Sequence, residues 1–304
     1  MANFSVNILG CGSAKPTLRH NPSCTVLNIR ECLYMIDCGE GVQQQMIRMK
    51  LKFNRLRHIF LTHLHGDHVL GLTGLLSTLS LQQTGGHMRI YTFKEGINWI
   101  KSQVAFFGRG LTYELEFVEI DSKHPVLAYE NNYLRVRTIP LNHSVPCVGY
   151  VVEEKPNLRH INKEMCDFHA VPVSRMQNLK LGEDFTKPDG TVLPNAMLTK
   201  PPTPSVSYAH IGDTSYMPGI ASDIGPVDLL YHESTYTAEH LKEAAARGHS
   251  TAAQAAAVAR ECGAKRLLLG HFSSRYKNDT LFLNEAQSIF PSTILANEGL
   301  TLSL

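Results

Sequence analysis

The chain has 304 residues, of which 43% are hydrophobic and 18% are charged, a composition typical of a globular protein with one large domain or two small ones. Its formal net charge of +2 is too small to attract a polyanion by itself, so any contact with nucleic acid must come from local patches. The seven scattered cysteines contain no C-x-x-C pair, which argues against a disulfide framework and against a thiolate zinc site. The start lacks the features of a signal peptide, and no apolar run is long enough to span a membrane. We therefore expect a cytoplasmic protein without membrane contact.

The beginning of the chain is predicted to form short core strands followed by a helix. Strands are expected at residues 6–9, 25–29 and 33–36, and a helix at 42–49. Gly10 and Gly12 follow the first strand, where a tight turn would explain them and a functional loop is the alternative. Asp37 follows the third strand, and we expect it to brace the site described next rather than to bind a metal itself. A basic run, which indicates a solvated face or alternatively a phosphate contact, comprises Arg48, Lys50, Lys52, Arg55 and Arg57.

The segment from residue 58 to 81 carries the strongest chemical signal. Residues 59–61 form a short apolar strand, and apolar side chains spaced as one helix face occupy residues 69–79. Between them stand four side chains of the types that bind zinc and similar metals, namely His63, His65, Asp67 and His68. Alternate residues of an extended segment point the same way, so His63 and His65 can face one ion. A polar loop with histidines by chance is the alternative, but four residues of ligand type within six positions argue against it.

Strand and helix patterns alternate through the rest of the chain. Strands are expected at 89–93, 114–120, 133–139, 147–152, 206–211, 229–232, 266–269 and within 293–304, and helices at 95–106, 238–247, 251–262 and 283–290. His143, Asp213, Glu233 and His271 all follow or end predicted strands. Gly248 suits the C-terminal cap of the helix that precedes it, and Ser250 or Thr251 suits the N-cap of the next helix.

Residues 154–205 differ in character from the rest of the chain. They contain seven prolines and show little periodicity, so we interpret them as an insertion that projects from a single domain spanning residues 1–304. A disordered linker is the alternative, although Met176, Leu179 and Leu181 could pack locally. Between Lys155 and Lys200 there are seven Lys or Arg and five Asp or Glu, so the insertion is only mildly basic.

Seven potential metal ligands follow predicted strands: His63, His65, Asp67, His68, His143, Asp213 and His271. A two-metal hydrolase needs about three ligands for each ion and one group that bridges them, with the ions about 3.5–4 Å apart. The set therefore predicts a dinuclear metal centre.

The H-x-H-x-D-H motif of residues 63–68 resembles the signature of the metallo-β-lactamase superfamily. This resemblance implies an α/β fold, the αβ/βα sandwich, with two metals at one edge. It also implies two ligand sets bridged by Asp213, with His63, His65 and His143 for one Zn²⁺ and Asp67, His68 and His271 for the other. Asp67 would in addition orient the attacking water, and Mn²⁺ is an alternative to zinc. The carboxylate at position 213 and the long insertion favour phosphodiester chemistry over lactam or thioester chemistry.

Four further motifs narrow the resemblance: residues 9–17 (LGCGSAKPT), 37–43 (DCGEGVQ), 232–235 (HEST) and 248–251 (GHST). Together they resemble the ribonuclease Z family of tRNA 3′-processing endoribonucleases, over residues 6–300. The resemblance implies cleavage of precursor tRNA just after the discriminator nucleotide, with a 3′-hydroxyl left on the tRNA and a 5′-phosphate on the trailer. It also implies that Glu233 and His249 form a catalytic pair that donates a proton to the leaving group. The alternative for His249 is a structural histidine at a helix end.

In that family the insertion is a flexible arm that grips the tRNA elbow, so residues 155–204 are the expected tRNA-binding exosite. Family arms commonly carry Gly-Pro near the tip, where this chain has Val173-Ser174-Arg175. The resemblance also implies a homodimer in which the arm of one subunit serves the active site of the other.

Two rival functions are weighed against this interpretation. A phosphodiesterase of the same superfamily that acts on a small or cyclic nucleotide would have no use for a projecting arm. A metal-binding RNA chaperone that lacks catalytic activity would need neither Asp67 nor the Glu233–His249 pair. Cleavage before or after an encoded CCA sequence is left open.

Overall fold

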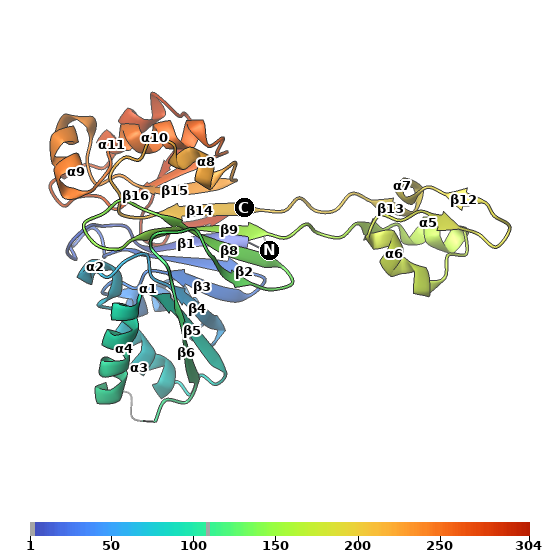
Figure 1. The fold of residues 1–304 in the computed structure, drawn as a ribbon, viewed down its shortest axis with the longest axis horizontal. Coiled ribbons are helices and arrows are strands. Elements are labelled where there is room, and N and C mark those ends of the chain that lie inside the picture. Colours follow the sequence, from blue (N-terminus) through green and yellow to red (C-terminus); the bar gives the residue numbers. More distant parts are fainter. Residues whose placement is uncertain (1–3, 108–109) are drawn as a thin grey trace. The chain divides into compact units, whose positions relative to one another are not determined.

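The computed structural model describes residues 4–107 and 110–304, which form two compact units (Figure 1). Unit 1 contains the chain up to Tyr129 together with Val136–Val152 and Ser207–Leu304, and unit 2 contains Glu130–Arg135 and Glu153–Val206. Within the described ranges, no helix is both long enough and apolar enough to cross a membrane.

The first sheet of unit 1 has seven strands in the order β18-β1-β2-β3-β4-β5-β6. Neighbours from β18 to β3 are antiparallel, and neighbours from β3 to β6 are parallel. The strands are β1 (Phe4–Gly10), β2 (Cys24–Ile29), β3 (Cys32–Ile36), β4 (Leu56–Phe60), β5 (His87–Thr92), β6 (Glu114–Glu119) and β18 (Thr301–Ser303). The helices that connect them are α1 (Val42–Arg48), η1 (Phe53–Arg55), α2 (Gly66–Val69), α3 (Leu72–Leu81) and α4 (Lys94–Phe107).

The second sheet also has seven strands, in the order β17-β16-β15-β14-β9-β8-β7. The run from β14 to β17 is parallel, so the carboxyl ends of these strands lie at one edge. The strands are β7 (Leu127–Glu130), β8 (Leu134–Pro140), β9 (Val148–Glu154), β14 (Ser207–Ile211), β15 (Leu229–Glu233), β16 (Leu267–Gly270) and β17 (Thr293–Leu295). The accompanying helices are α8 (Ile220–Ile224), η3 (Ala238–His240), α9 (Leu241–Arg247), α10 (Ala252–Glu261) and α11 (Thr280–Gln287).

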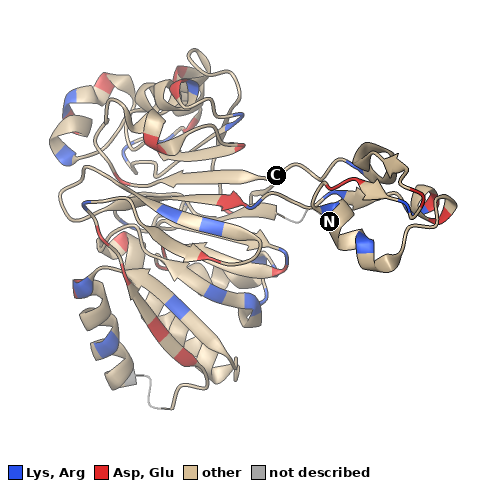
Figure 2. Ribbon diagram, turned by 45° about the vertical axis from the view of Figure 1, so that its right-hand side comes forward, with Lys and Arg blue, Asp and Glu red and all other residues tan. Residues whose placement is uncertain are grey.

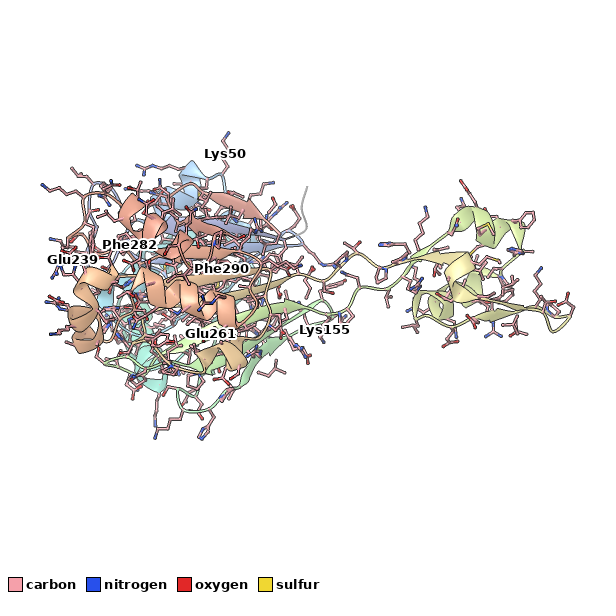
Figure 3. All side chains as sticks on the ribbon, turned by 90° about the horizontal axis from the view of Figure 1, so that it is seen from above. Lys50, Lys155, Glu239, Glu261, Phe282 and Phe290 are labelled. Atoms are coloured by element: carbon pink, nitrogen blue, oxygen red, sulfur yellow. The ribbon has the colours of Figure 1, made fainter. Side chains whose placement is uncertain are left out.

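Unit 1 is a four-layer sandwich in which helices cover the outer face of each sheet. Helices α1, α3 and α4 lie on the side of the first sheet, and α8, α10 and α11 lie on the side of the second (Figure 1). Leu72, Leu75, Leu76 and Leu79 of α3 are buried in one cluster with strand residues such as Ile59. On the other side, Phe282 of α11 is fully buried against Phe272 and Tyr276 (Figure 3). The predicted αβ/βα sandwich is therefore confirmed.

Several boundaries differ from the sequence predictions. The helix expected at 69–79 is two helices, α2 and α3, and Gly71 lies between them. A side chain at Gly71 would meet the carbonyl oxygen of Gly39 at 2.0 Å, so the break is set by close backbone contact with the loop after β3. Helix α11 begins at Thr280, three residues before the predicted start, and strand β7 was not predicted at all. Lys50, part of the basic run, extends away from the fold into solvent (Figure 3).

Unit 2 has a small core of its own. Its elements are β10 (His160–Ile161), α5 (Lys163–Phe168), η2 (Val173–Arg175), α6 (Met176–Lys180), β11 (Phe185–Thr186), β12 (Val192–Leu193), α7 (Asn195–Leu198) and β13 (Thr199–Lys200). Six buried side chains form the core: Cys166, Val171, Leu179, Phe185, Leu193 and Leu198. The amide of buried Asn195 donates hydrogen bonds to the carbonyl oxygens of Leu179 and Glu183 at 2.8 and 2.7 Å. Basic and acidic residues alternate along the ribbon of this unit (Figure 2).

Candidate metal centre and acid–base pair

The ends of four strands of unit 1 deliver the predicted ligands to one place. His63 and His65 follow β4 of the first sheet, and the next turn begins α2 with Asp67 and His68. His143, Asp213 and His271 follow β8, β14 and β16 of the second sheet. Both sheets are therefore required to assemble the seven side chains, and no local segment contains them all.

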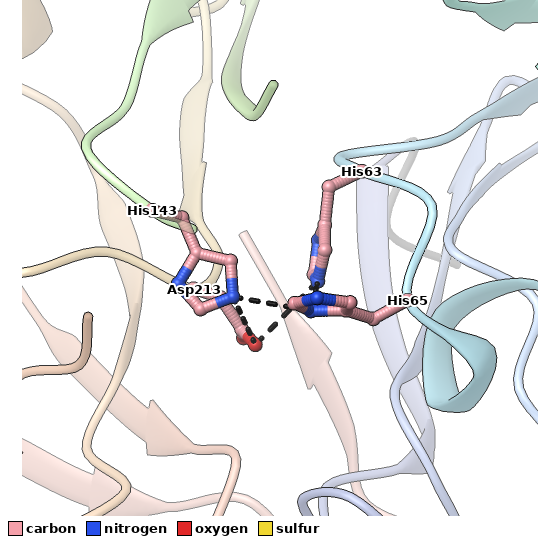
Figure 4. A group of neighbouring side chains, drawn as sticks. All are labelled: His63, His65, His143 and Asp213. Carbon is pink, nitrogen blue, oxygen red and sulfur yellow. Dashed lines mark hydrogen bonds and ion pairs between the residues drawn. The ribbon is translucent and has the colours of Figure 1, made fainter. Parts of the chain in front are cut away.

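The first group of side chains is drawn in Figure 4. Nδ1 of His65 lies 3.0 Å from Nε2 of His63 and 3.1 Å from Nε2 of His143. Oδ2 of Asp213 lies 3.6 and 3.8 Å from the same two Nε2 atoms. Four ligands about 2.0–2.1 Å from a tetrahedral ion are separated from one another by roughly 3.3 Å, so these spacings suit a single metal ion.

The second group lies on the other side of Asp213. Nε2 of His68 is 3.6 Å from Oδ2 of Asp213, and Nε2 of His271 is 3.2 Å from its Oδ1. Oδ2 of Asp67 is 3.6 Å from His68 and 3.5 Å from His271, measured to the same nitrogens. The two oxygens of Asp213 thus face both groups, which is the arrangement a bridging ligand needs.

Four of the five imidazoles, those of His63, His68, His143 and His271, are oriented by a partner on the outer nitrogen. Nδ1 of His68 lies 2.8 Å from Oδ2 of Asp37, and Nδ1 of His143 lies 2.8 Å from the carbonyl oxygen of Gly248. The other two contacts of this kind are those of His63 with Thr62, at 3.0 Å, and of His271 with Thr235, at 2.8 Å. Such partners fix the tautomer and aim the second nitrogen inward, as they do around metal-bound histidines.

Three buried atoms at the centre have no hydrogen-bond partner among the described residues: Nε2 of His68, Nε2 of His271 and Oδ1 of Asp213. Buried polar atoms left unpaired are costly, so atoms that converge on one point in this state are typical of ligands to a cation. Burial alone would raise the pKa of Asp213, but the neighbouring His271 and His68 lower it well below its usual range. The donor set therefore fits divalent metal ions.

Asp37 serves as a brace, as the sequence predicted. One of its oxygens accepts hydrogen bonds from the backbone N–H and the hydroxyl of Thr62, at 2.8 and 3.0 Å. The other faces His68. Asp37 and His271 both have a left-handed backbone, with φ of 59° and 61°, which is unfavourable for residues other than glycine. Strain of this kind persists only where surrounding contacts impose it, and it concentrates at functional sites.

Glu233 and His249 form a second constellation beside the metal ligands. Oε1 of Glu233 lies 3.0 Å from Nδ1 of His249 and accepts a hydrogen bond from the backbone N–H of Ser250 at 2.9 Å. Its Oε2 accepts from the N–H and the hydroxyl of Thr235, at 2.9 and 2.8 Å. Burial lowers the pKa of His249, but the charge and hydrogen bond of Glu233 outweigh this and raise the pKa from 6.5 to about 9. The imidazole therefore carries a proton at neutral pH.

Local capping places His249 at its position. Gly248 ends α9 in the left-handed conformation, and Thr251 begins α10 with a capping box in which Gln254 is its partner. A ring nitrogen of His249 also lies within 4.8 Å of ligand atoms of Asp213 and His271, so a metal-ligand role is the geometric alternative to that of a proton donor.

The site opens into a cleft of about 640 Å³ in unit 1. Its lining includes His65, Asp67, His143, Asp213, His249 and His271, together with Lys15 and Arg247. Sequence reasoning did not predict the parts played by Thr62, Thr235, the carbonyl of Gly248 or the loop after β1. The HEST motif contains Thr235, but nothing in one sequence distinguishes its hydroxyl from that of any other threonine.

Two family models match parts of the chain. The model described as anti-Pycsar protein Apyc1 matches residues 4–104, and the β-lactamase superfamily domain matches residues 160–272. These matches agree with the metallo-β-lactamase fold predicted from the H-x-H-x-D-H motif.

Curated relatives match the chain over its full length. Proteins named ribonuclease Z from Parabacteroides distasonis and Porphyromonas gingivalis are each 47% identical over 100% of both chains. The crystal structure of the short form of human tRNase Z is 27% identical, covers 98% of both chains and has a TM-score of 0.72. A Bacillus subtilis metallo-β-lactamase fold protein, YhfI, is 18% identical with a TM-score of 0.68, which shows the shared fold.

The contact between Asp37 and His68 predicts the effect of one conservative substitution. Asp37→Asn keeps the size of the side chain but removes the charge that orients the imidazole, so affinity for divalent metal should fall about 10-fold to 100-fold. Competition titration against a chelator, with dialysed protein, measures this change. Asp121→Asn is the matched control, because its histidine partner, His124, lies on the exposed surface. Equal metal affinity in the Asp37 variant and the wild type would contradict the assigned role.

Proposed function

The chain belongs to the ribonuclease Z family, and on that premise we propose how its own residues carry out the reaction. Its activity is that of a metal-dependent endoribonuclease that processes the 3′ end of precursor tRNA. The identity of 47% over the whole length of named ribonuclease Z proteins carries this conclusion. The alternative of a phosphodiesterase for small or cyclic nucleotides is not favoured, since these relatives match the insertion as well as the catalytic unit.

We propose that the site holds two divalent ions, Zn²⁺ or alternatively Mn²⁺. His63, His65 and His143 would bind one ion and Asp67, His68 and His271 the other, with Asp213 between them. The spacings of 3.0–3.8 Å among these atoms and the unpaired nitrogens of His68 and His271 support this assignment. Bound ions would supply an activated water and positive charge opposite the reacting phosphate.

The chain's own acid–base groups act on the two sides of the reacting phosphorus. The carboxylate of Asp67 would accept a hydrogen bond from the attacking water and so orient it. The leaving 3′-oxygen of the tRNA needs a proton as its bond breaks, and we assign its donation to His249. Glu233 already holds Nδ1 of this imidazole, so the proton would come from Nε2. The products are a 3′-hydroxyl on the tRNA and a 5′-phosphate on the trailer.

We further propose that residues 155–204 are a tRNA-binding arm and that two chains form a homodimer in which the arms are exchanged. Unit 2 has its own core, so it can present a defined surface without support from the metal site. Phe168 and Val173 are 80% and 84% exposed, and the positive charge comes from side chains such as Arg175 and Lys180. Exposed apolar groups and a few cations suit contact with a folded RNA surface through shape and phosphates. A cytoplasmic location stays a prediction.

The metal assignment predicts that Asp213 is indispensable. Elemental analysis of the wild type should find close to two divalent ions per chain. Asp213→Ala should lower that number and abolish cleavage of a precursor tRNA and of bis(p-nitrophenyl) phosphate alike, because the ions generate the nucleophile. Mapping of the tRNA product ends checks the cleavage position. Full activity of metal-free protein would overturn the assignment.

The arm assignment predicts that binding and chemistry separate. Replacement of residues 157–200 by a short Gly-Ser linker should leave hydrolysis of bis(p-nitrophenyl) phosphate intact, since no proposed ligand lies there. Binding of precursor tRNA should weaken by about 2–4 kcal/mol as phosphate and shape contacts are lost. Mixing this variant with Asp213→Ala chains should restore tRNA cleavage if the arm of one chain serves the cleft of its partner. Loss of both activities in the arm variant would show that the segment belongs to the catalytic unit.

The proton-donor assignment predicts a substrate-dependent effect for His249. A sugar alkoxide leaves slowly without a proton, whereas nitrophenolate leaves readily without one. His249→Ala should therefore slow tRNA cleavage about 10²-fold to 10⁴-fold and barely change hydrolysis of bis(p-nitrophenyl) phosphate. Glu233→Gln should follow the same pattern with a smaller loss. Equal losses on both substrates, with lower metal content, would instead make His249 a metal ligand.

A further inference from the structure

The loop between β1 and β2, residues 11–23, touches the proposed metal site through its backbone. The N–H of Ala14 donates a hydrogen bond of 2.7 Å to Oδ2 of Asp67. This is the carboxylate oxygen that faces the unpaired nitrogens of His68 and His271. The loop therefore fixes the orientation of the Asp67 carboxylate, which is proposed to orient the attacking water.

Ala14 holds this contact in an unfavourable conformation. Its φ is +64°, in the left-handed region that residues with a Cβ rarely adopt. A backbone in this state persists when the surrounding structure imposes it. The Ala14 side chain itself is exposed, so the constraint comes from backbone contacts around it, including a hydrogen bond of 3.1 Å from the N–H of Ser13 to the carbonyl oxygen of Phe272.

The loop folds back tightly on itself. The N–H of Gly12 donates to the carbonyl oxygen of Asn21 at 2.9 Å, and the N–H of Thr17 donates to that of His20 at 2.9 Å. A Cβ at Gly12 would lie 2.8 Å from Cβ of His20, so only glycine permits this approach. The placement of His20 therefore helps to set the course of the loop past Ala14, together with the backbone hydrogen bonds between the loop and Phe272.

His20 belongs to a cluster in which Cys11 and His20 are buried and Asp279 and Glu298 are half-buried. Nδ1 of His20 lies 3.0 Å from Oε2 of Glu298, and Nε2 lies 2.9 Å from Oδ2 of Asp279. A carboxylate accepts hydrogen bonds, so both ring nitrogens must donate and the imidazole is doubly protonated. The hydrogen bonds to Asp279 and Glu298 accordingly raise the pKa of His20 from 6.5 to about 9. Arg19 is the other charged group here, and it pairs with Asp279 at 2.5 Å.

The same cluster could be considered as a metal site, because ligand atoms of Cys11, His20 and Glu298 lie within 4.8 Å of one another. Metal binding requires a thiolate and a neutral imidazole. Burial raises the pKa of the Cys11 thiol well above its usual value, and both nitrogens of His20 are already bonded. An ionic bridge between two carboxylates accounts for the cluster better than a metal ion does.

We propose that His20 is a positioning residue for the reaction. Its bridge between Asp279, which precedes α11, and Glu298, which precedes β18, holds the loop so that the N–H of Ala14 orients Asp67. The inference rests on the proposed role of Asp67, but the mechanical link from His20 to Ala14 is independent of that role. Loss of the bridge should therefore impair turnover more than substrate binding.

The test compares His20→Gln, which removes the charge, with the matched control His87→Gln. His87 also pairs with a carboxylate, that of Glu114 at 3.0 Å, but both side chains are more than 60% exposed. With metal-loaded enzyme and bis(p-nitrophenyl) phosphate, His20→Gln should lower kcat about 10-fold to 100-fold with KM within about twofold of the wild type. The control should retain wild-type values of both.

A second measurement reports on the loop without catalysis. Hydrogen exchange of the full-length, metal-free protein should show the amide of Ala14 exchanging about tenfold faster in His20→Gln than in the wild type. Glu298→Gln keeps an acceptor oxygen but loses the charge. It should lower kcat and speed the exchange of the Ala14 amide by smaller factors than His20→Gln does. It replaces His20→Gln in the test if that variant does not fold.

The outcomes separate this inference from the role proposed for Asp67. If Asp67→Asn abolishes activity while His20→Gln or Glu298→Gln keeps the wild-type kcat and Ala14 protection, His20 is not a positioning residue. If these variants lose only thermal stability, with kcat unchanged, the cluster is purely structural and the inference also fails. If Asp67→Asn remains active, the role of Asp67 is wrong, and faster exchange of Ala14 still supports the link from His20 to the loop.

Discussion

The carboxylate of Asp213 is the constraint on which the rest of the catalytic unit depends. It is 2% exposed, and its oxygens lie 3.2–3.8 Å from nitrogens of His63, His68, His143 and His271. A buried negative charge is tolerated only where opposite charge or a metal compensates it. The compensating groups come from β4 in one sheet and from β8 and β16 in the other, so the charge is compensated only when the two sheets meet at this edge.

Hydrogen bonds from neighbouring residues keep those imidazoles in place, and some of the residues around the site have a strained backbone. Asp37, Ala14 and His271 all have positive φ, and each of them touches a proposed ligand or is one. Close backbone contacts also hold the ligands in place. The lack of a side chain at Gly39 and Gly71 lets the loop after β3 pack against the turn that carries Asp67 and His68. The free energy spent on this strain is offset by the core contacts of the sandwich, such as those of α3 with β4.

The proposed function assigns chemistry to unit 1 and tRNA recognition to unit 2. The proposed ligands and the Glu233–His249 pair all belong to unit 1, whereas the core of unit 2 is complete without them. A catalytic centre needs side chains held within fractions of an ångström, while a grip on RNA needs a surface that can reach a distant part of the substrate. Under the proposed assignment the two tasks lie in different units, so each can be met without compromising the other.

The sequence by itself determined the candidate metal ligands, most of the strands and helices of unit 1 and the family, because these depend on local patterns. Four residues of ligand type in six positions need no tertiary information, and neither do the short apolar runs that mark β4 and β16. It did not determine the break between α2 and α3, which close packing of backbone segments sets. It also did not determine the exposed strand β7 or the core of unit 2, because the hydrophobic residues there show little periodicity. Only the tertiary structure showed that Thr235 links Glu233, His249 and His271, and that His20 lies between Asp279 and Glu298. Those contacts join residues up to 278 positions apart, and the free energy that selects such partners comes from burial in the folded state.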